Sequence, residues 1–75
     1  MENKLKKIIA KTFNCKISEI KETTTINKIK QWDSLNHYKL VANIEKEFKL
    51  KFKKGEPETL TSFKILLATI KSYHA

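Results

Sequence analysis

Arginine is absent from this 75-residue chain, although the chain is strongly basic. Its sixteen basic residues are all lysines, and its formal net charge is +8. A small basic domain suggests nucleic-acid binding, but arginine supplies the planar fork that reads guanine and clamps phosphate. Lysine can still bind phosphates without sequence preference. We therefore expect a solvated lysine surface and keep non-specific nucleic-acid binding as an alternative.

Cysteine and long apolar runs are equally scarce. Cys15 is the single cysteine, so no internal disulfide can form and a reducing cytoplasm is the expected compartment. No apolar stretch approaches the length of a membrane span, and residues 1–13 lack the apolar core and cleavage site of a signal peptide. The sequence therefore predicts a cytoplasmic protein without a membrane-spanning segment.

Glycine and proline occur once each, and 40% of the residues are hydrophobic, which favours a globular, helical chain. The chain makes one small domain, 1–75. This length is near the lower limit at which an apolar core stabilises a fold without disulfides or a structural metal. So small a core leaves little room for a buried active site. We therefore expect a protein that other proteins act upon, and not an enzyme.

Hydrophobic residues recur at helical spacing in three places. The pattern predicts a first helix over about 2–14, a second over about 34–48, and a third whose apolar face runs over 63–73. Thr61 or Ser62 is the expected N-cap of the third helix. These segments predict an all-α protein.

The connection between the first two helices, residues 15–33, is longer than is usual in a compact domain. Isoleucines recur along it and are expected to hold it against the core; they are Ile17, Ile20, Ile26 and Ile29. After the second helix, a short helical turn is expected near 56–60, because Pro57 suits the first position of a helix. The predicted fold is a small helical bundle with one long first connection.

The second helix begins within WDSLNHYKLV, residues 32–41, which hold the only tryptophan and the only aspartate. Asp33 is a preferred N-cap residue, because its carboxylate can accept the backbone N–H groups of the first turn and its charge suits the helix dipole. Ser34 then takes the first helical position, exposed among free N–H donors. An attached phosphate is tolerated best at such a position.

Helical spacing places Leu35, Tyr38 and Ala42 on the same side as Ser34. The core face of this helix is already supplied by four other residues: Leu40, Val41, Ile44 and Phe48. An additional apolar patch beside an exposed serine indicates a contact surface. Alternatively, Leu35 and Tyr38 pack under the long connection, and the sequence leaves both possibilities open.

The segment WDSLNHYKLVANIEKEFKLKF resembles the centre of an acyl or peptidyl carrier protein, with Asp33-Ser34-Leu35 matching the Asp-Ser-Leu attachment motif. The likeness extends to the LKKII first helix, the isoleucine-punctuated connection and the final amphipathic helix. It implies a four-helix bundle of acyl-carrier-protein type with a short third helix. It also implies that Ser34 receives 4′-phosphopantetheine from coenzyme A, so that the terminal thiol carries an acyl or aminoacyl group as a thioester.

The resemblance also implies which proteins the chain would meet. A phosphopantetheinyl transferase would recognise Ser34 with the help of Asp33. Leu35, Tyr38 and Ala42 would contact partner enzymes, namely an acyl- or aminoacyl-loading ligase and acyltransferase or synthase enzymes. A free carrier is usually monomeric, so a monomer is expected, although the Leu35 and Tyr38 patch could self-associate.

The sequence departs from carriers of fatty acid synthesis, which are acidic on the second helix. Here the matching face carries Asn36, His37, Lys39 and Asn43. Lys39 would repel a partner arginine, which favours a dedicated carrier in a specialised pathway over bulk fatty acid synthesis. Trp32 stands where those carriers have a small residue; it either anchors the long connection or forms part of the partner surface. A carrier-like fold without the arm, acting as a binding or regulatory protein, is the other alternative.

Other reactive side chains form no complete constellation. Ser34 and His37 are three residues apart, which could activate the hydroxyl, but only Asp33 could orient the imidazole and it is suited to capping. Cys15, His37 and His74 lack metal-ligand spacing, so no metal site is expected. Cys15 is expected to be a small apolar residue at the end of the first helix, and His74 is expected to fray.

Overall fold

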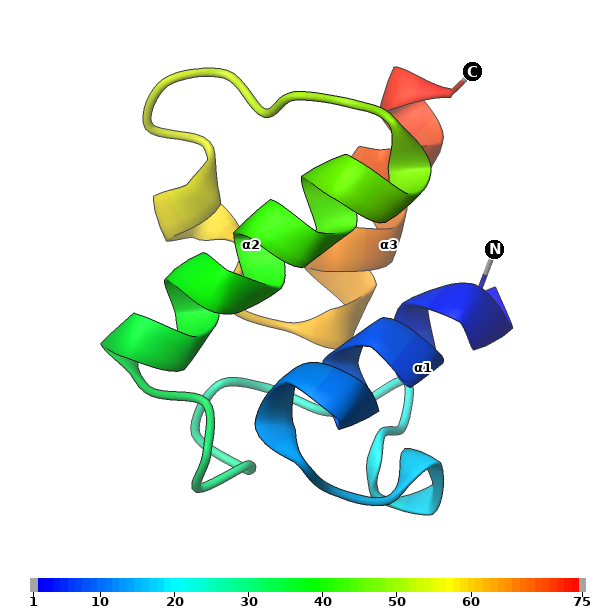
Figure 1. The fold of residues 1–75 in the computed structure, drawn as a ribbon, viewed down its shortest axis with the longest axis vertical. Coiled ribbons are helices and arrows are strands. Elements are labelled where there is room, and N and C mark those ends of the chain that lie inside the picture. Colours follow the sequence, from blue (N-terminus) through cyan, green and yellow to red (C-terminus); the bar gives the residue numbers. More distant parts are fainter. Residues whose placement is uncertain (1, 75) are drawn as a thin grey trace.

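Three α-helices form most of the structure (Figure 1). In the computed structural model, which describes residues 2–74, α1 spans Glu2–Phe13, α2 spans Ser34–Phe48 and α3 spans Phe63–Tyr73. Two short 3₁₀ helices lie in the connections, η1 (Ile17–Glu19) and η2 (Pro57–Thr59). No strand and no helix able to span a membrane occurs among these residues. The all-α prediction and the three helix ranges are confirmed.

The helix α2 is the central element of the fold. In Figure 1 it crosses the front of the molecule, with α1 beside it and α3 behind it. Asn43 of α2 donates a hydrogen bond to the Thr12 hydroxyl of α1 (2.9 Å), and Lys4 donates to the carbonyl oxygen of Glu47 (3.0 Å). The core between the helices contains fully buried residues from all three: Leu5, Ile9, Leu40, Ile44, Phe63, Leu66 and Ile70.

Only some of the isoleucines in residues 14–33 pack against the core. Ile20 and Ile29 are buried, and Ile26 packs partly buried against the core. Ile17 is 47% exposed, so the prediction that it holds the connection against the core is wrong. The reason is that Ile17 opens η1, a surface turn in which every residue is exposed.

The same connection is joined to the start of α3 by backbone hydrogen bonds. The N–H of Ile26 donates to the carbonyl of Thr61 (2.9 Å), and the N–H of Phe63 donates to the carbonyl of Thr24 (2.9 Å). Thr24 is buried, and its hydroxyl accepts the N–H of Lys21 (2.7 Å). Long-range pairing, rather than a local turn signal, therefore fixes the course of residues 14–33.

The helices α1 and α2 end in the same way, in left-handed residues. Asn14 and Lys49 have φ values of 55° and 53°. The residue after each donates back into the last turn: the N–H of Cys15 to the carbonyl of Ala10 (2.9 Å) and that of Leu50 to the carbonyl of Glu45 (3.1 Å). This is the Schellman arrangement, which satisfies carbonyls that the helix leaves free.

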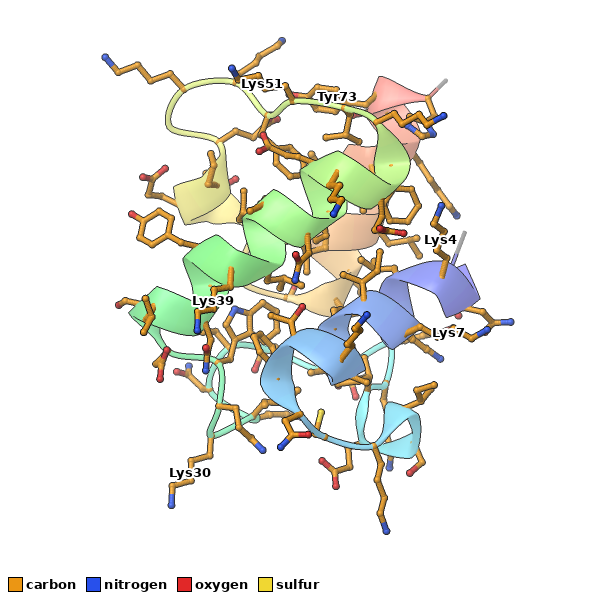
Figure 2. The ribbon with its side chains drawn as sticks, viewed as in Figure 1. Lys4, Lys7, Lys30, Lys39, Lys51 and Tyr73 are labelled. Atoms are coloured by element: carbon orange, nitrogen blue, oxygen red, sulfur yellow. The ribbon has the colours of Figure 1, made fainter. Side chains whose placement is uncertain are left out.

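The connection after α2 is held by polar side chains from both neighbouring helices. The Glu45 carboxylate accepts the N–H of Phe52 (2.8 Å), and the N–H of Lys53 is shared between the Glu56 carboxylate (3.0 Å) and the Tyr73 hydroxyl (3.1 Å). Tyr73, at the end of α3 (Figure 2), also donates to Glu56. The short helical turn expected near 56–60 follows as η2, with Pro57 at its first position.

Candidate modification site at the start of α2

Asp33 caps α2, as its position in the sequence predicts. Its backbone is extended, and its Oδ1 accepts the N–H of Asn36 (2.8 Å), while its carbonyl accepts the N–H of His37 (2.8 Å). The Asn36 side chain reinforces this start by donating to the carbonyl of Gln31 (2.8 Å). Hydrogen bonds from residues on both sides of Ser34 therefore hold the first turn of α2.

Ser34 is the first residue of α2 and is exposed. Within the part of the chain that the structure describes, no group bonds to its hydroxyl. The backbone N–H groups of Ser34 and Leu35, the first two of α2, have no intrahelical acceptor, and Asp33 accepts the N–H of Asn36 instead of theirs. The site therefore presents a free hydroxyl next to two free donors at the positive end of the α2 dipole.

The apolar residues beside Ser34 face the solvent. Leu35 is 67% exposed and Tyr38 is 59% exposed, and Ala42 is exposed as well. The alternative in which Leu35 and Tyr38 pack under residues 14–33 is therefore wrong. These three side chains form an apolar surface along α2, which we call the Leu35–Tyr38–Ala42 surface.

His37 is the site residue that sequence analysis placed wrongly. The sequence predicts that it lies on the solvent-facing side with Asn36 and Lys39, yet it is only 9% exposed. Its Nδ1 accepts the indole N–H of Trp32 (2.9 Å), and its Nε2 lies 2.7 Å from the carbonyl oxygen of Pro57. Since the indole N–H only donates and the carbonyl only accepts, the hydrogen of the imidazole is on Nε2.

Trp32 is an anchor and not part of an exposed surface, because it is only 3% exposed. Its ring centroid lies 5.4 Å from that of Phe13 and 6.2 Å from that of His37, nearly parallel to the imidazole. The chain of contacts from Phe13 through Trp32 and His37 to Pro57 therefore joins α1, the start of α2 and η2. We call the last three residues the Trp32–His37–Pro57 link.

The Trp32–His37–Pro57 link determines whether His37 can activate the Ser34 hydroxyl. Both nitrogens of His37 are engaged, and the structure gives no hydrogen bond between Ser34 and His37. Among residues 2–74, no three His, Cys, Asp or Glu side chains are placed to hold one metal ion. Within residues 2–74, the Ser34 hydroxyl therefore has no hydrogen-bonded imidazole that could act as its base.

Cys15 and His74 lie far along the chain from Ser34 and take structural positions. Cys15 is half-buried against the core, and burial, together with the nearby Glu19 carboxylate, raises the pKa of its thiol. His74, expected to fray, instead places its Nε2 2.9 Å from the carbonyl oxygen of Phe48, with its ring edge toward the Phe48 ring. That contact satisfies a carbonyl at the end of α2, which the helix itself leaves free.

No protein-family model matches this chain, and no curated protein is significantly similar to it.

Proposed function

We propose that the protein is an acyl or aminoacyl carrier protein in which Ser34 bears 4′-phosphopantetheine. The observation that carries the proposal is the free, exposed Ser34 hydroxyl at the first position of a capped helix, inside an Asp-Ser-Leu sequence. In this reading η2 takes the place of the short third helix, and residues 14–33 take that of the long first loop, of a four-helix carrier bundle.

The local chemistry favours a phosphodiester at Ser34. In the attachment step, the Ser34 oxygen would form a bond to the β-phosphorus of coenzyme A, the phosphoanhydride bond would break, and the nucleoside bisphosphate would leave. The hydroxyl proton would pass to a base of the transferase. The resulting anion would lie beside the free N–H groups of Ser34 and Leu35 at the helix N-terminus, where negative charge is stabilised.

The attached arm would supply a thiol that carries acyl or aminoacyl groups as thioesters. The chain's own residues would bring the partners to it. Asp33 would hold the helix start for the transferase, and the Leu35–Tyr38–Ala42 surface would contact the loading ligase and the acyltransferase or synthase enzymes. Lys39, exposed beside that surface, would select partners with acidic surfaces. We therefore place the carrier in a specialised pathway, as a cytoplasmic monomer, rather than in bulk fatty acid synthesis.

Intact-mass spectrometry tests the proposal directly. The protein would be incubated with coenzyme A, magnesium and a broad-specificity phosphopantetheinyl transferase. We expect a gain of one phosphopantetheine in the wild type and in Ser18→Ala, which changes another exposed serine, and none in Ser34→Ala. No gain from folded wild type with several transferases would instead indicate a carrier-like binding protein that lacks the arm.

The stability of the variants separates folding from attachment. Ser34→Ala should leave the free energy of unfolding nearly unchanged, because the hydroxyl has no hydrogen-bond partner among the described residues. Asp33→Ala should lower it by about 1 kcal/mol through loss of the cap. Urea denaturation followed by circular dichroism measures both, and unfolding of Ser34→Ala would refute the placement of Ser34 as a free surface hydroxyl.

A further inference from the structure

A basic groove lies between α1 and α2, away from Ser34. Its volume is about 480 Å³, and α1 contributes three lysines to its lining, Lys4, Lys7 and Lys11. The other helix adds Lys46 and Glu47. Four lysines and one glutamate give the lining a net charge of +3. Figure 2 shows Lys4 and Lys7 projecting from α1.

Among residues 2–74, three of the four lysine ammonium groups in the lining have no hydrogen-bond or ion-pair partner. Lys4 is engaged, because it donates to the carbonyl of Glu47 and lies 5.1 Å from the centre of the Phe48 ring. In residues 2–74 the structure gives one ion pair, Lys6 with Glu2. Lys7, Lys11 and Lys46 are exposed, line the same groove and form no ion pair within residues 2–74, so an anionic partner would reduce the repulsion among their charges.

The spacing of the lysines indicates the shape of that partner. Lys4, Lys7 and Lys11 recur once per turn, so they rise along α1 in steps of about 4.5 and 6 Å. Carboxylates placed once per turn on another helix have the same spacing. The hydrogen bond between Asn43 and Thr12 joins α1 and α2 at the groove, so that lysines of both helices line it.

We propose that this groove docks an acidic helix of a partner protein, one that carries Asp or Glu about once per turn. The proposal does not depend on modification of Ser34. In register along α2, Lys39 lies two turns before Lys46 (Figure 2 labels it), so a docked helix could extend toward the start of α2.

Other anionic ligands fit the groove less well. Nucleic-acid binding sites typically use arginine, or aromatic side chains on which bases stack, and the lining contains neither. A small phosphate is usually bound by several backbone N–H donors, but apart from Lys4 the lining residues lie beyond the first turn of their helices, where these donors are engaged in intrahelical bonds. Binding to an anionic membrane requires exposed apolar side chains beside the lysines, and the groove lining contains none of the large exposed ones, which are Ile17, Leu35, Tyr38 and Ile65.

An NMR titration of the unmodified wild-type protein tests the proposal. The probe is an alanine-based helical peptide with one glutamate per turn, and its control is the same peptide with glutamine. We expect amide shift changes centred on Lys7, Lys11, Thr12, Asn43 and Lys46 with the glutamate peptide alone. Because charge pairing in a solvent-exposed groove is screened, the affinity should fall as salt rises.

Paired variants locate the binding. Lys7→Gln with Lys46→Gln should weaken binding by about tenfold, and Lys51→Gln with Lys54→Gln, which removes the same charge outside the groove, by no more than about twofold. Equal weakening by both pairs, or shift changes spread over residues 49–54, would overturn the proposal. So would tighter binding at the groove of oligothymidylate or of phosphatidylserine vesicles than of the glutamate peptide.

Discussion

At the scale of single residues, two serines that begin helices have opposite surroundings. The Ser62 hydroxyl accepts the N–H of Ile65 (3.2 Å) and caps α3. Ser34 follows a cap instead of being one, because Asp33 has already taken that place in α2. This one-residue offset between cap and serine leaves the Ser34 hydroxyl without a hydrogen-bond partner among residues 2–74.

Tyr73 and Glu56 form a residue-scale pair whose hydrogen bond depends on pH. The hydrogen bond from Tyr73 lowers the pKa of Glu56, and the same bond to Glu56 raises the pKa of Tyr73. Because the pKa of Glu56 is lowered in the folded protein, Glu56 contributes stability at pH values above the ordinary carboxyl pKa. This contribution is lost as the pH falls through the lowered pKa. Because the pKa of Tyr73 is raised in the folded protein, Tyr73 contributes stability at pH values below the ordinary phenol pKa. This contribution is lost as the pH rises through the raised pKa.

Replacing Tyr73 should therefore change the pH profile of stability. Tyr73→Phe should destabilise the protein most around neutral pH, and its difference from the wild type should shrink in acid and in strong alkali. Urea midpoints measured across this range test the prediction. Tyr38→Phe is the matched control, because Tyr38 is exposed and the described structure gives its hydroxyl no hydrogen bond. A Tyr73→Phe difference that stays constant with pH would contradict the role given to this hydrogen bond.

At the scale of elements, the helices follow from local sequence signals, whereas the contacts that join them depend on residues far apart in the sequence. Hydrophobic spacing predicted α1, α2 and α3, and Asp33 was predictable as a cap because each signal lies within a few residues. The burial of His37 required a partner twenty residues away at Pro57. One signal did point to it: His37 is in phase with the buried stripe of α2, Leu40, Val41, Ile44 and Phe48. The sequence pattern nevertheless predicts that the polar His37 is exposed, because it does not reveal the buried partners of the imidazole, the Trp32 indole and the Pro57 carbonyl.

Ile17 shows the opposite failure of pattern. It is apolar and regularly spaced with Ile20, but it lies in η1 and is half exposed. In a connection without a continuous helix, spacing along the sequence does not fix which side chains face the core. The course of residues 14–33 depends instead on the pairing of Thr25 with Ser62, for which the sequence gives no local sign.

The Trp32–His37–Pro57 link should behave as one cooperative unit. His37→Phe leaves the buried indole N–H and the Pro57 carbonyl without their partner, so it should lower the free energy of unfolding by about 1–3 kcal/mol. Trp32→Phe removes the other side of the first bond. In a double-mutant cycle by urea denaturation, we expect the combined variant to lose less than the sum of the single losses. Strict additivity would show that the two rings are energetically independent.

At the scale of the whole molecule, like charges dominate the surface. The net charge is +8, and one ion pair, Lys6 with Glu2, is found in the described residues. The lysines lie on every connection as well as along α1 and α2. Mutual repulsion of this kind destabilises a folded chain, since folding brings the charges closer together.

Salt should therefore stabilise the protein. Raising sodium chloride from about 10 mM to about 200 mM shortens the screening length from roughly 30 Å to under 10 Å, less than the 28 Å length of the molecule. We expect the urea midpoint to rise over this range. Lys51→Gln with Lys54→Gln should raise the midpoint at low salt and reduce its salt dependence. A midpoint that falls on adding salt would show that unrecognised ion pairs stabilise the fold.

The burial of Trp32 has an optical consequence. It is the only tryptophan of the chain, it is shielded from water, and it is bonded to His37 within the first turn of the helix that Ser34 begins. Its ultraviolet emission therefore comes from a single known environment. A change in that emission would report, without any added dye, that something has altered the first turn of α2.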